Sequence, residues 1–193
     1  HVPLPPYIKR ADDASDRTSY QTVFAAHPGS AAAPTAGLHF TQTLLDRLRA
    51  KGVVIARVTL HVGYGTFQPI EATVVEEHRM HAEDFEVTEE AARTIAERSG
   101  RLIAVGTTSA RVLETLAATG GIRAAAGRTD IFLHPGNPPR AIDGLLTNFH
   151  LPKSSLLLLV CGLAGTERIL AAYEAAVERG YRFYSYGDAM LIL

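Results

Sequence analysis

Cysteine occurs only once in the 193-residue sequence, at position 161, so no disulfide can form within the chain. The longest apolar stretch, residues 156–163, is far shorter than the ~20 residues that cross a bilayer, and it indicates a buried element. No basic segment followed by an apolar run and a small-residue cleavage site opens the sequence. These absences favour a protein of the reducing cytoplasm.

An excess of either charge is also lacking, because 19 basic residues stand against 20 acidic ones and the formal net charge is −1. This balance excludes a basic tail or a uniformly cationic nucleic-acid module, so any contact with RNA must be local. The sequence has no initiator Met and begins within a proline-rich segment, His1–Tyr7. We therefore expect further sequence upstream of residue 1.

Predicted strands and helices alternate along most of the chain. Residues 1–36 show little periodicity and predict an extended arm, which an α/β domain over residues 37–193 follows. The predicted strands are 53–61, 102–105, 131–133, 145–149, 181–185 and 189–193, and an acidic loop is predicted over 78–86. Predicted helices follow Thr41, Thr88 and Gly106 and cover 154–163 and 166–179. The alternation predicts a three-layer α/β sandwich whose sheet has several parallel neighbours.

A glycine and three hydroxyl residues, Gly106, Thr107, Thr108 and Ser109, join a predicted strand to a predicted helix. Unpaired amides and hydroxyls at a helix start make an anion-binding site, although ordinary helix capping would use one hydroxyl of the same turn. Arg111 follows on the same helix, and its spacing from Glu114 is also that of a solvated ion pair.

Six of the eight histidines lie near predicted strand ends: His39, His61, His78, His81, His134 and His150. A lone histidine is more often structural than functional. Together with Glu83, His78 and His81 invite a zinc interpretation, but they lack the spacing of the helical zinc signature. A histidine and a nearby carboxylate can instead supply a general base and its orienting partner.

Two further segments place polar or aromatic side chains beside predicted strand ends. In the first, Asn148 and His150 can contact the polar edges of a ligand, but a strand terminus followed by a proline-initiated helix has the same pattern. The second segment, residues 181–188, has aromatic faces beside a charge, and such a cluster serves packing equally well.

Taken together, the segments resemble one family, the S-adenosylmethionine:tRNA ribosyltransferase-isomerases of queuosine biosynthesis. Matching strings occur along nearly the whole chain, at Pro3–Ile8, Tyr20–Thr22, Ala33–Phe40, Thr59–Gly63, Gly65–Phe67, His78–His81, Ala104–Ser109, Thr147–Pro152 and Ser185–Met190. One stretch departs from the pattern, because Cys161–Gly165 reads CGLAG where the family is expected to have SAFAG.

The resemblance implies transfer and isomerisation of the ribosyl part of S-adenosylmethionine onto 7-aminomethyl-7-deazaguanine in tRNA. Epoxyqueuosine forms, and adenine and methionine leave. It also implies a Rossmann-like three-layer α/β domain with an inserted β-barrel domain. The chain matches only the carboxy-terminal part of that pattern, so we expect the β-barrel and the first α/β elements to be absent from it.

Roles for individual residues follow from this chemistry. A base must remove a proton beside the sulfonium, and the incoming amine must lose one. The candidates for the base and its orienting carboxylate are His39, His61, His78, His81, His150, Glu83 and Asp188. Candidates for binding S-adenosylmethionine or the base are Thr35, Tyr64, Thr66, Phe67, Gly106, Thr107, Thr108, Ser109, Arg111, Asn148, Tyr184 and Tyr186. Lys153 and Arg182 are candidates for contact with tRNA phosphates, and no resident metal is expected.

Two alternatives remain open from the sequence. One is a nucleotide- or RNA-binding fragment without catalytic activity, which would bind S-adenosylmethionine but release no adenine. The other is a metal-dependent hydrolase that uses His78, His81 and Glu83. Elemental analysis of the purified protein separates the second alternative from the rest.

Overall fold

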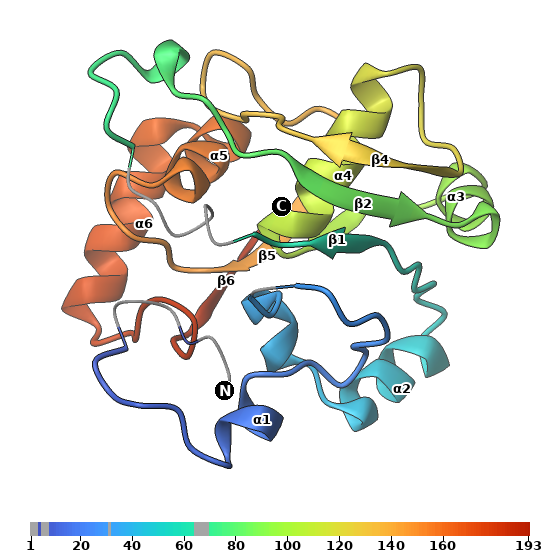
Figure 1. Cartoon of the computed structure of the whole chain (residues 1–193), viewed down its shortest axis with the longest axis horizontal. Coiled ribbons are helices and arrows are strands. Elements are labelled where there is room, and N and C mark those ends of the chain that lie inside the picture. The colour runs from blue at the N-terminus through green and yellow to red at the C-terminus, as the bar shows by residue number, and fades with distance from the viewer. Residues whose placement is uncertain (1–3, 5–7, 31, 64–69) are drawn as a thin grey trace.

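The computed structural model describes residues 4, 8–30, 32–63 and 70–193, which form a mixed α/β fold with two small sheets (Figure 1). Its α-helices and 3-10 helices are α1 (Asp16–Ser19), η1 (Thr35–His39), α2 (Gln42–Ala50), η3 (Val75–Glu77), α3 (Glu89–Ala96), α4 (Thr107–Ala118), α5 (Ser155–Ala164) and α6 (Thr166–Glu178). Its strands are β1 (Thr59–His61), β2 (Glu83–Val87), β3 (Ile103–Val105), β4 (Ala125–Thr129), β5 (Gly144–Asn148) and β6 (Ala189–Ile192).

The six strands divide equally between the two sheets. The first sheet has the order β1-β2-β4, and both of its pairs are antiparallel. The second has the order β3-β5-β6, in which β3 and β5 are parallel and β6 is antiparallel to β5. The sequence predicted one sheet with several parallel neighbours. Among the described strands, β3 and β5 are the only parallel pair.

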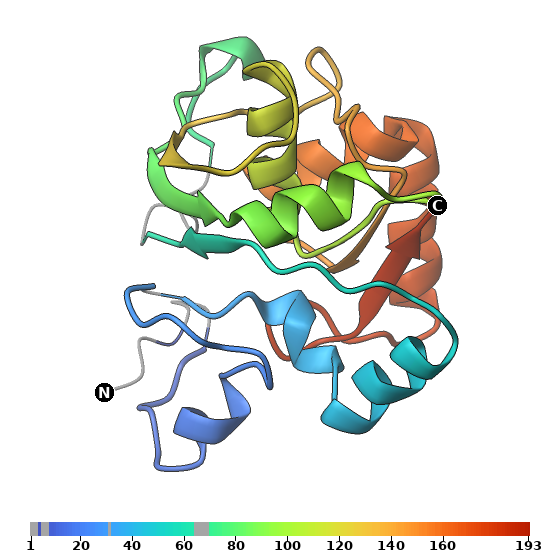
Figure 2. The same ribbon diagram turned by 90° about the vertical axis from the view of Figure 1, so that its right-hand side faces the viewer.

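Helix α4 joins the two halves of the core. Its Ala110 and Leu113 belong to a hydrophobic cluster with Leu145 of β5 and Val160 of α5. On its other side, Val112 and Leu116 pack with Phe85 and Val87 of β2 and with α3. Figure 2 shows α4 between the first sheet and the layer that contains α5 and α6. The two hydrophobic clusters therefore share one helix.

Helix starts agree closely with the sequence predictions. The Thr41 hydroxyl accepts a hydrogen bond from the amide of Leu44, and the Thr88 hydroxyl accepts one from Ala91. Both side chains satisfy amides that have no partner within the helix, which is the reason threonine is favoured there. The predicted caps of α2 and α3 are thus confirmed.

Some of the predicted strands are wrong. Residues 131–133 form no strand, because the Ile131 amide donates to Thr129 Oγ1 and the Phe132 carbonyl accepts from the Asn137 side chain. Residues 181–185 form none either, since Tyr184 has a φ of 71°, outside the range of a strand. Conversely, β2 overlaps the second half of the predicted acidic loop, 78–86.

The first strand is shorter than predicted, because β1 covers only Thr59–His61. The preceding valines, Val53 and Val54, are 45% and 74% exposed and lie outside any strand. A β-branched run forms a strand only where a partner pairs with it, and here the pairing with β2 begins at Thr59.

Residues 8–30, with α1, lie along one side of the molecule beside the loop that precedes β6 (Figures 1 and 2). The Asp16 carboxylate is only 1% exposed and accepts hydrogen bonds from Arg10 at 2.6 and 2.7 Å and from the Tyr186 hydroxyl at 3.0 Å. The Arg10 guanidinium is the main reason that the pKa of Asp16 lies well below its usual value. The bond from Tyr186 connects parts of the chain that are 170 residues apart in sequence.

Within the described residues, no single helix has the length and apolar character needed to cross a membrane. Helices α5 and α6 meet the criterion only as a pair, which is bent by 115° at their junction.

Candidate functional site

A cavity of about 210 Å³ opens at the carboxyl ends of β3 and β5. Because the two strands are parallel, the loops that follow them leave the same edge of the sheet. The lining comes from residues 32–36, Val62, residues 106–108, residues 147–152, Ser154, Leu156, Tyr184 and Ser185. The predicted meeting of the glycine and threonine turn with the end of β5 is therefore present.

The first turn of α4 forms one wall of the cavity. Gly106 precedes the helix with a φ of 87° and a ψ of 147°, a conformation open essentially to glycine alone. A Cβ at this position would lie 3.1 Å from Thr108 Oγ1. No side chain caps the helix, so the amides of its first turn and its dipole favour a negative group in the cavity.

Asn148, at the end of β5, connects three parts of the chain. Its side chain is 3% exposed and accepts a hydrogen bond from Thr35 Oγ1 at 3.2 Å. The Asn148 Nδ2 lies 3.1 Å from His39 Nε2 and 3.2 Å from the carbonyl oxygen of Tyr184. Asn148 thereby fixes η1 and the loop before β6 against β5, at the wall of the cavity.

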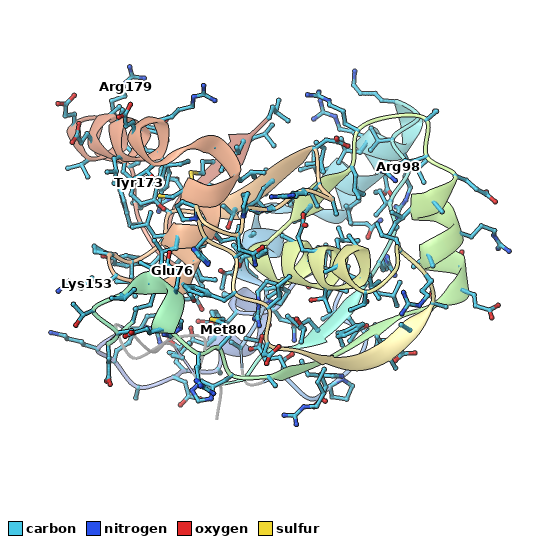
Figure 3. All side chains as sticks on the ribbon, turned by 90° about the horizontal axis from the view of Figure 1, so that it is seen from above. Glu76, Met80, Arg98, Lys153, Tyr173 and Arg179 are labelled. Carbon is cyan, nitrogen blue, oxygen red and sulfur yellow. The ribbon has the colours of Figure 1, made fainter. Side chains whose placement is uncertain are left out.

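His150 lies beside Asn148 in the lining, with its Nε2 3.0 Å from Thr147 Oγ1. Burial lowers the pKa of His150 to about 4, although the residue keeps part of its surface exposed. Its backbone amide donates to the hydroxyl of Tyr173 at 2.8 Å. Tyr173 extends from α6 toward the body of the molecule, whereas Arg179, the residue after that helix, points outward (Figure 3). Because its pKa is about 4, the His150 side chain is neutral at pH 7.

The cavity gathers only part of the predicted site. Seven of the candidate residues line it, namely Thr35, Gly106, Thr107, Thr108, Asn148, His150 and Tyr184. His39 does not line the cavity but contacts Asn148, which does. Ser109 is also outside the lining and follows Thr108 on α4. Tyr64, Thr66 and Phe67 lie outside the described residues. The other described candidates do not line the cavity.

Glu83 and Arg111 form a buried ion pair, and neither residue belongs to the cavity lining. Each side chain is 4% exposed, and Arg111 Nη1 donates to Glu83 Oε2. The second carboxylate oxygen of Glu83 accepts from the amide of Gly63 at 2.8 Å. The ion pair joins α4 to β2, so both side chains have structural partners.

The alternative interpretation of Arg111 and Glu114 as a solvated ion pair is wrong. Glu114 is only 5% exposed, and its Oε1 accepts from the amides of Arg140 and Ala141 at 2.9 and 2.7 Å. A buried carboxylate requires such donors. Spacing along a helix predicted that the two side chains are neighbours, but it contained no information about partners from other segments.

His78 and His134 both contact Phe132, with ring centroids 5.0 and 4.7 Å from its ring. Burial, and to a smaller extent the charge of His81, lowers the pKa of His78. Within the described part of the chain, no three His, Cys, Asp or Glu side chains gather where they could hold a metal ion. The structure does not bring these histidines to the cavity.

His61 neighbours the lining residue Val62, but its ring faces residue 29. A Cβ at Gly29 would lie 2.8 Å from His61 Nδ1. This nitrogen is buried and has no hydrogen-bond partner among the residues described.

Several charged or aromatic candidates lie outside the lining. Asp188 accepts from the amide of Arg182 at 2.7 Å, and this bond is the main reason that the pKa of Asp188 is lowered. The Arg182 guanidinium also pairs with Asp188 at 3.5 Å. Tyr186 donates to Asp16, as described above. Lys153 lies between the lining residues Pro152 and Ser154 and projects at the outer edge of the molecule (Figure 3).

The predicted site residues do not include the other lining residues, namely Ala32, Ala33, Pro34, Ala36, Val62, Thr147, Phe149, Leu151, Pro152, Ser154, Leu156 and Ser185. Thr147 and Ser154 stand next to predicted residues, and their position at the ends of β5 and α5 could have identified them. Residues 32–34 carry no chemical signal, because alanine and proline contribute shape rather than reactive groups.

Comparison with known proteins assigns the chain to a family. A family model described as queuosine biosynthesis protein matches residues 1–192. The S-adenosylmethionine:tRNA ribosyltransferase-isomerase of Anaeromyxobacter sp. (strain K) is 57% identical over 195 residues, which are 100% of this chain and 56% of that protein. The protein of the same name from Acidithiobacillus ferrooxidans (strain ATCC 53993 / BNL-5-31) is 59% identical over 99% of this chain and 56% of its own length.

A solved structure agrees with the sequence comparison. The crystal structure of S-adenosylmethionine tRNA ribosyltransferase from Thermotoga maritima matches with a TM-score of 0.68 and 43% identity. The match covers 82% of this chain and 51% of that chain. The chain spans little more than half the length of the curated relatives it matches. With a family match over nearly every residue, the chain belongs to the queuosine biosynthesis protein family.

Proposed function

We propose that this chain forms the S-adenosylmethionine site of an enzyme that transfers and isomerises the ribosyl part of S-adenosylmethionine onto 7-aminomethyl-7-deazaguanine in tRNA. Epoxyqueuosine, adenine and methionine are the products. The names of relatives that are 57% and 59% identical support the reaction. The observation that carries the proposal is the cavity that joins the uncapped start of α4 to Asn148 and His150.

The cavity fits one end of the substrate. Its volume of about 210 Å³ is smaller than the ~300–1,000 Å³ typical of pockets for drug-sized ligands. We propose that the methionine part enters it and that its carboxylate accepts hydrogen bonds from the amides of Thr107 and Thr108 and from the Thr108 hydroxyl. Tyr184, together with Tyr64 and Phe67, supplies aromatic faces for the sulfonium.

Proton transfer then requires a base beside the sulfonium. The candidates near the cavity are His39 and His150, and an imidazole that is neutral at pH 7 suits the removal of a proton from the carbon next to sulfur. Asp188 is the nearby carboxylate candidate, because it lies on the same loop as Tyr184, whose carbonyl oxygen shares the Asn148 amide with His39. Lys153 and Arg182, both exposed, are proposed contacts for tRNA phosphates.

The domain assignment belongs to the same proposal. Residues 1–36 form an arm, and residues 37–193 form the carboxy-terminal part of a Rossmann-like three-layer domain. The parallel pair β3 and β5, with α4 between them in sequence, supports this assignment. The β-barrel domain and the first α/β elements belong to the part of the relatives that the chain does not span. We propose a cytoplasmic location.

The test uses the full-length protein that contains this chain. Incubation with S-adenosylmethionine and a tRNA carrying the 7-aminomethyl base is followed by mass spectrometry of the tRNA and by detection of free adenine. The mass of the epoxide together with adenine release is the expected result. S-adenosylmethionine binding without adenine release would select the non-catalytic alternative and overturn the proposal.

A substitution in α4 tests the carboxylate site. We expect Thr108→Val to raise the KM for S-adenosylmethionine about tenfold, because hydrogen bonds to a charged group contribute roughly 1.5–3 kcal/mol. Thr119→Val, at the far end of the same helix, is the matched control and leaves the KM unchanged. Equal KM values for the wild type and Thr108→Val would refute the placement of the carboxylate.

The metal-dependent hydrolase is the less favoured reading. It requires Glu83 as a ligand, but both Glu83 oxygens already accept hydrogen bonds, from Arg111 and from the Gly63 amide. Stoichiometric metal in the purified protein, found by elemental analysis, would restore this alternative.

A further inference from the structure

The side-chain amide of Asn148 contacts three groups whose chemistry fixes its orientation. The backbone carbonyl of Tyr184 can only accept a hydrogen bond, and it lies 3.2 Å from Asn148 Nδ2. If the amide were rotated by half a turn, its oxygen would face that carbonyl oxygen, and two acceptors would meet in a buried place. The amide nitrogen therefore faces Tyr184, and the amide oxygen faces the Thr35 hydroxyl, which can donate to it.

The second hydrogen of the same amide has one neighbour, His39 Nε2, at 3.1 Å. An amide N–H donates, so Nε2 must accept and cannot bear a proton. A neutral imidazole bears one proton, which is then on Nδ1. In a doubly protonated ring, Nε2 would be a donor that faces the donor Nδ2 of Asn148. The amide therefore disfavours that form as well.

We propose that Asn148 is a positioning residue that holds His39 as the neutral tautomer protonated on Nδ1, with its Nε2 lone pair bound. The part that this plays in catalysis rests on the function proposed above. The Asn148 side chain donates to His39 and Tyr184 and accepts from Thr35, so its hydrogen bonds join β5 to two other segments, and the residue is 3% exposed. Such a partner sets the tautomer of a histidine as a carbonyl or carboxylate does elsewhere.

This arrangement assigns different chemistry to the two histidines near the cavity. His39 presents a hydrogen-bond donor at Nδ1, and its Nε2 becomes a base only when the Asn148 amide moves away. His150 has its ring nitrogen 3.0 Å from a hydroxyl, which can donate or accept, so its tautomer is not fixed in the same way. Proton removal through His39 Nε2 therefore requires that substrate binding first releases the amide.

Nitrogen-15 labelling of histidine in this chain tests the tautomer directly. Two-bond proton–nitrogen correlation spectra distinguish the nitrogen that bears a proton from the one that does not, and His39→Gln identifies the signals of His39. We expect an unprotonated Nε2 in the wild type near pH 7. A protonated Nε2 in the wild type would overturn the proposal, whatever any variant does.

Asn148→Asp replaces the donor by a carboxylate that only accepts. The proton of His39 is then expected on Nε2, a reversal that a purely structural role of Asn148 would not produce. Asn137→Asp is the matched control, since the Asn137 amide donates to the Phe132 carbonyl at 3.0 Å on another loop, and the His39 pattern stays unchanged. An unaltered His39 pattern in folded Asn148→Asp would refute the proposal.

Turnover by the full-length protein separates this inference from the proposed function. If the wild type forms no epoxyqueuosine, the proposed function is wrong, but the measured tautomer of His39 is unaffected. If the wild type is active, we expect Asn148→Asp to lower kcat about 100-fold, the contribution expected of a positioned proton-transfer group. A reversed tautomer with full kcat would overturn the positioning role.

Discussion

At the scale of single residues, His150 combines a place in the cavity wall with an unusually low pKa of about 4, which burial causes. An unfolded histidine titrates near its ordinary value of about 6.5. Between these two values the unfolded chain binds a proton at position 150 that the folded chain does not bind. Stability therefore rises with pH across this range.

We expect the wild type to lose about 3 kcal/mol of unfolding free energy through His150 as the pH falls from about 6.5 to about 4. Above pH 6.5 the residue makes no contribution to the pH dependence. His150→Gln removes the titrating group, so urea unfolding of this variant is expected to show a smaller loss over the same range. Parallel pH curves for the two proteins would show that His150 does not titrate as the structure requires.

Single residues also show what the sequence reveals well. Thr41 and Thr88 were predicted as caps because capping depends on the next three residues alone. Asn148 was predicted as a ligand contact from its place at a strand end. Its partners Thr35 and His39 lie 113 and 109 residues away, and no local pattern encodes a pairing at such a separation.

At the scale of elements, the buried ion pair between Glu83 and Arg111 attaches β2 to α4. We expect Glu83→Gln to destabilise the chain by about 3 kcal/mol, because it leaves the guanidinium buried without a countercharge. Chemical denaturation gives this value directly. Replacing both residues by apolar side chains of similar volume is expected to recover much of the loss.

The same strand supplies the control for this prediction. Asp84 is 69% exposed and lies 3.4 Å from Arg128, which is 68% exposed. Asp84→Asn is expected to change the stability by less than about 0.5 kcal/mol, as is usual for exposed pairs. Equal effects of the two substitutions would mean that burial does not govern the Glu83 pair.

The elements that the sequence failed to predict share a physical cause. Strand β2 reads EDFEV and alternates buried with exposed residues, but its inward Glu83 concealed the pattern because buried glutamate is rare. Strand β4 reads AAGRT, which has little intrinsic preference for a strand, and pairing with β2 determines it. Helices α5 and α6 were predicted within one residue at each end, since their periodicity is local.

At the scale of the whole molecule, Asp16 fastens residues 8–20 to the loop before β6. Burial, and then the hydrogen bond to Asp16, raises the pKa of Tyr186 to about 12, so the phenol remains a donor throughout the neutral range. We expect Tyr186→Phe to speed tryptic cleavage after Arg10, because the arm is released more often while the rest stays folded.

Gel electrophoresis over a time course measures this cleavage. Tyr181→Phe, on the same loop, is the control and is expected to leave the rate unchanged. Cleavage of Tyr186→Phe at the wild-type rate would show that Arg10 and the remaining contacts hold the arm without the phenol.

The division of the strands into two sheets is a property of the whole molecule, and the sequence analysis did not predict it. Alternation of strands and helices indicated an α/β fold, and the parallel pair β3 and β5 agrees with it. However, β1, β2 and β4 carry no signal of belonging to a separate antiparallel sheet. The packing of Val112 and Leu116 against Phe85, on the opposite side of α4, stabilises that sheet.

Because α4 contributes side chains to the hydrophobic clusters on both of its sides, we expect neither sheet to fold as a separate fragment. The strands of the two sheets are also interleaved along the chain, so every cut between β1 and β6 separates the strands of at least one sheet. A library of truncations or circular permutants should consequently yield soluble protein only from versions that retain residues 59–192 together. The shared helix therefore makes residues 59–192 a single folding unit.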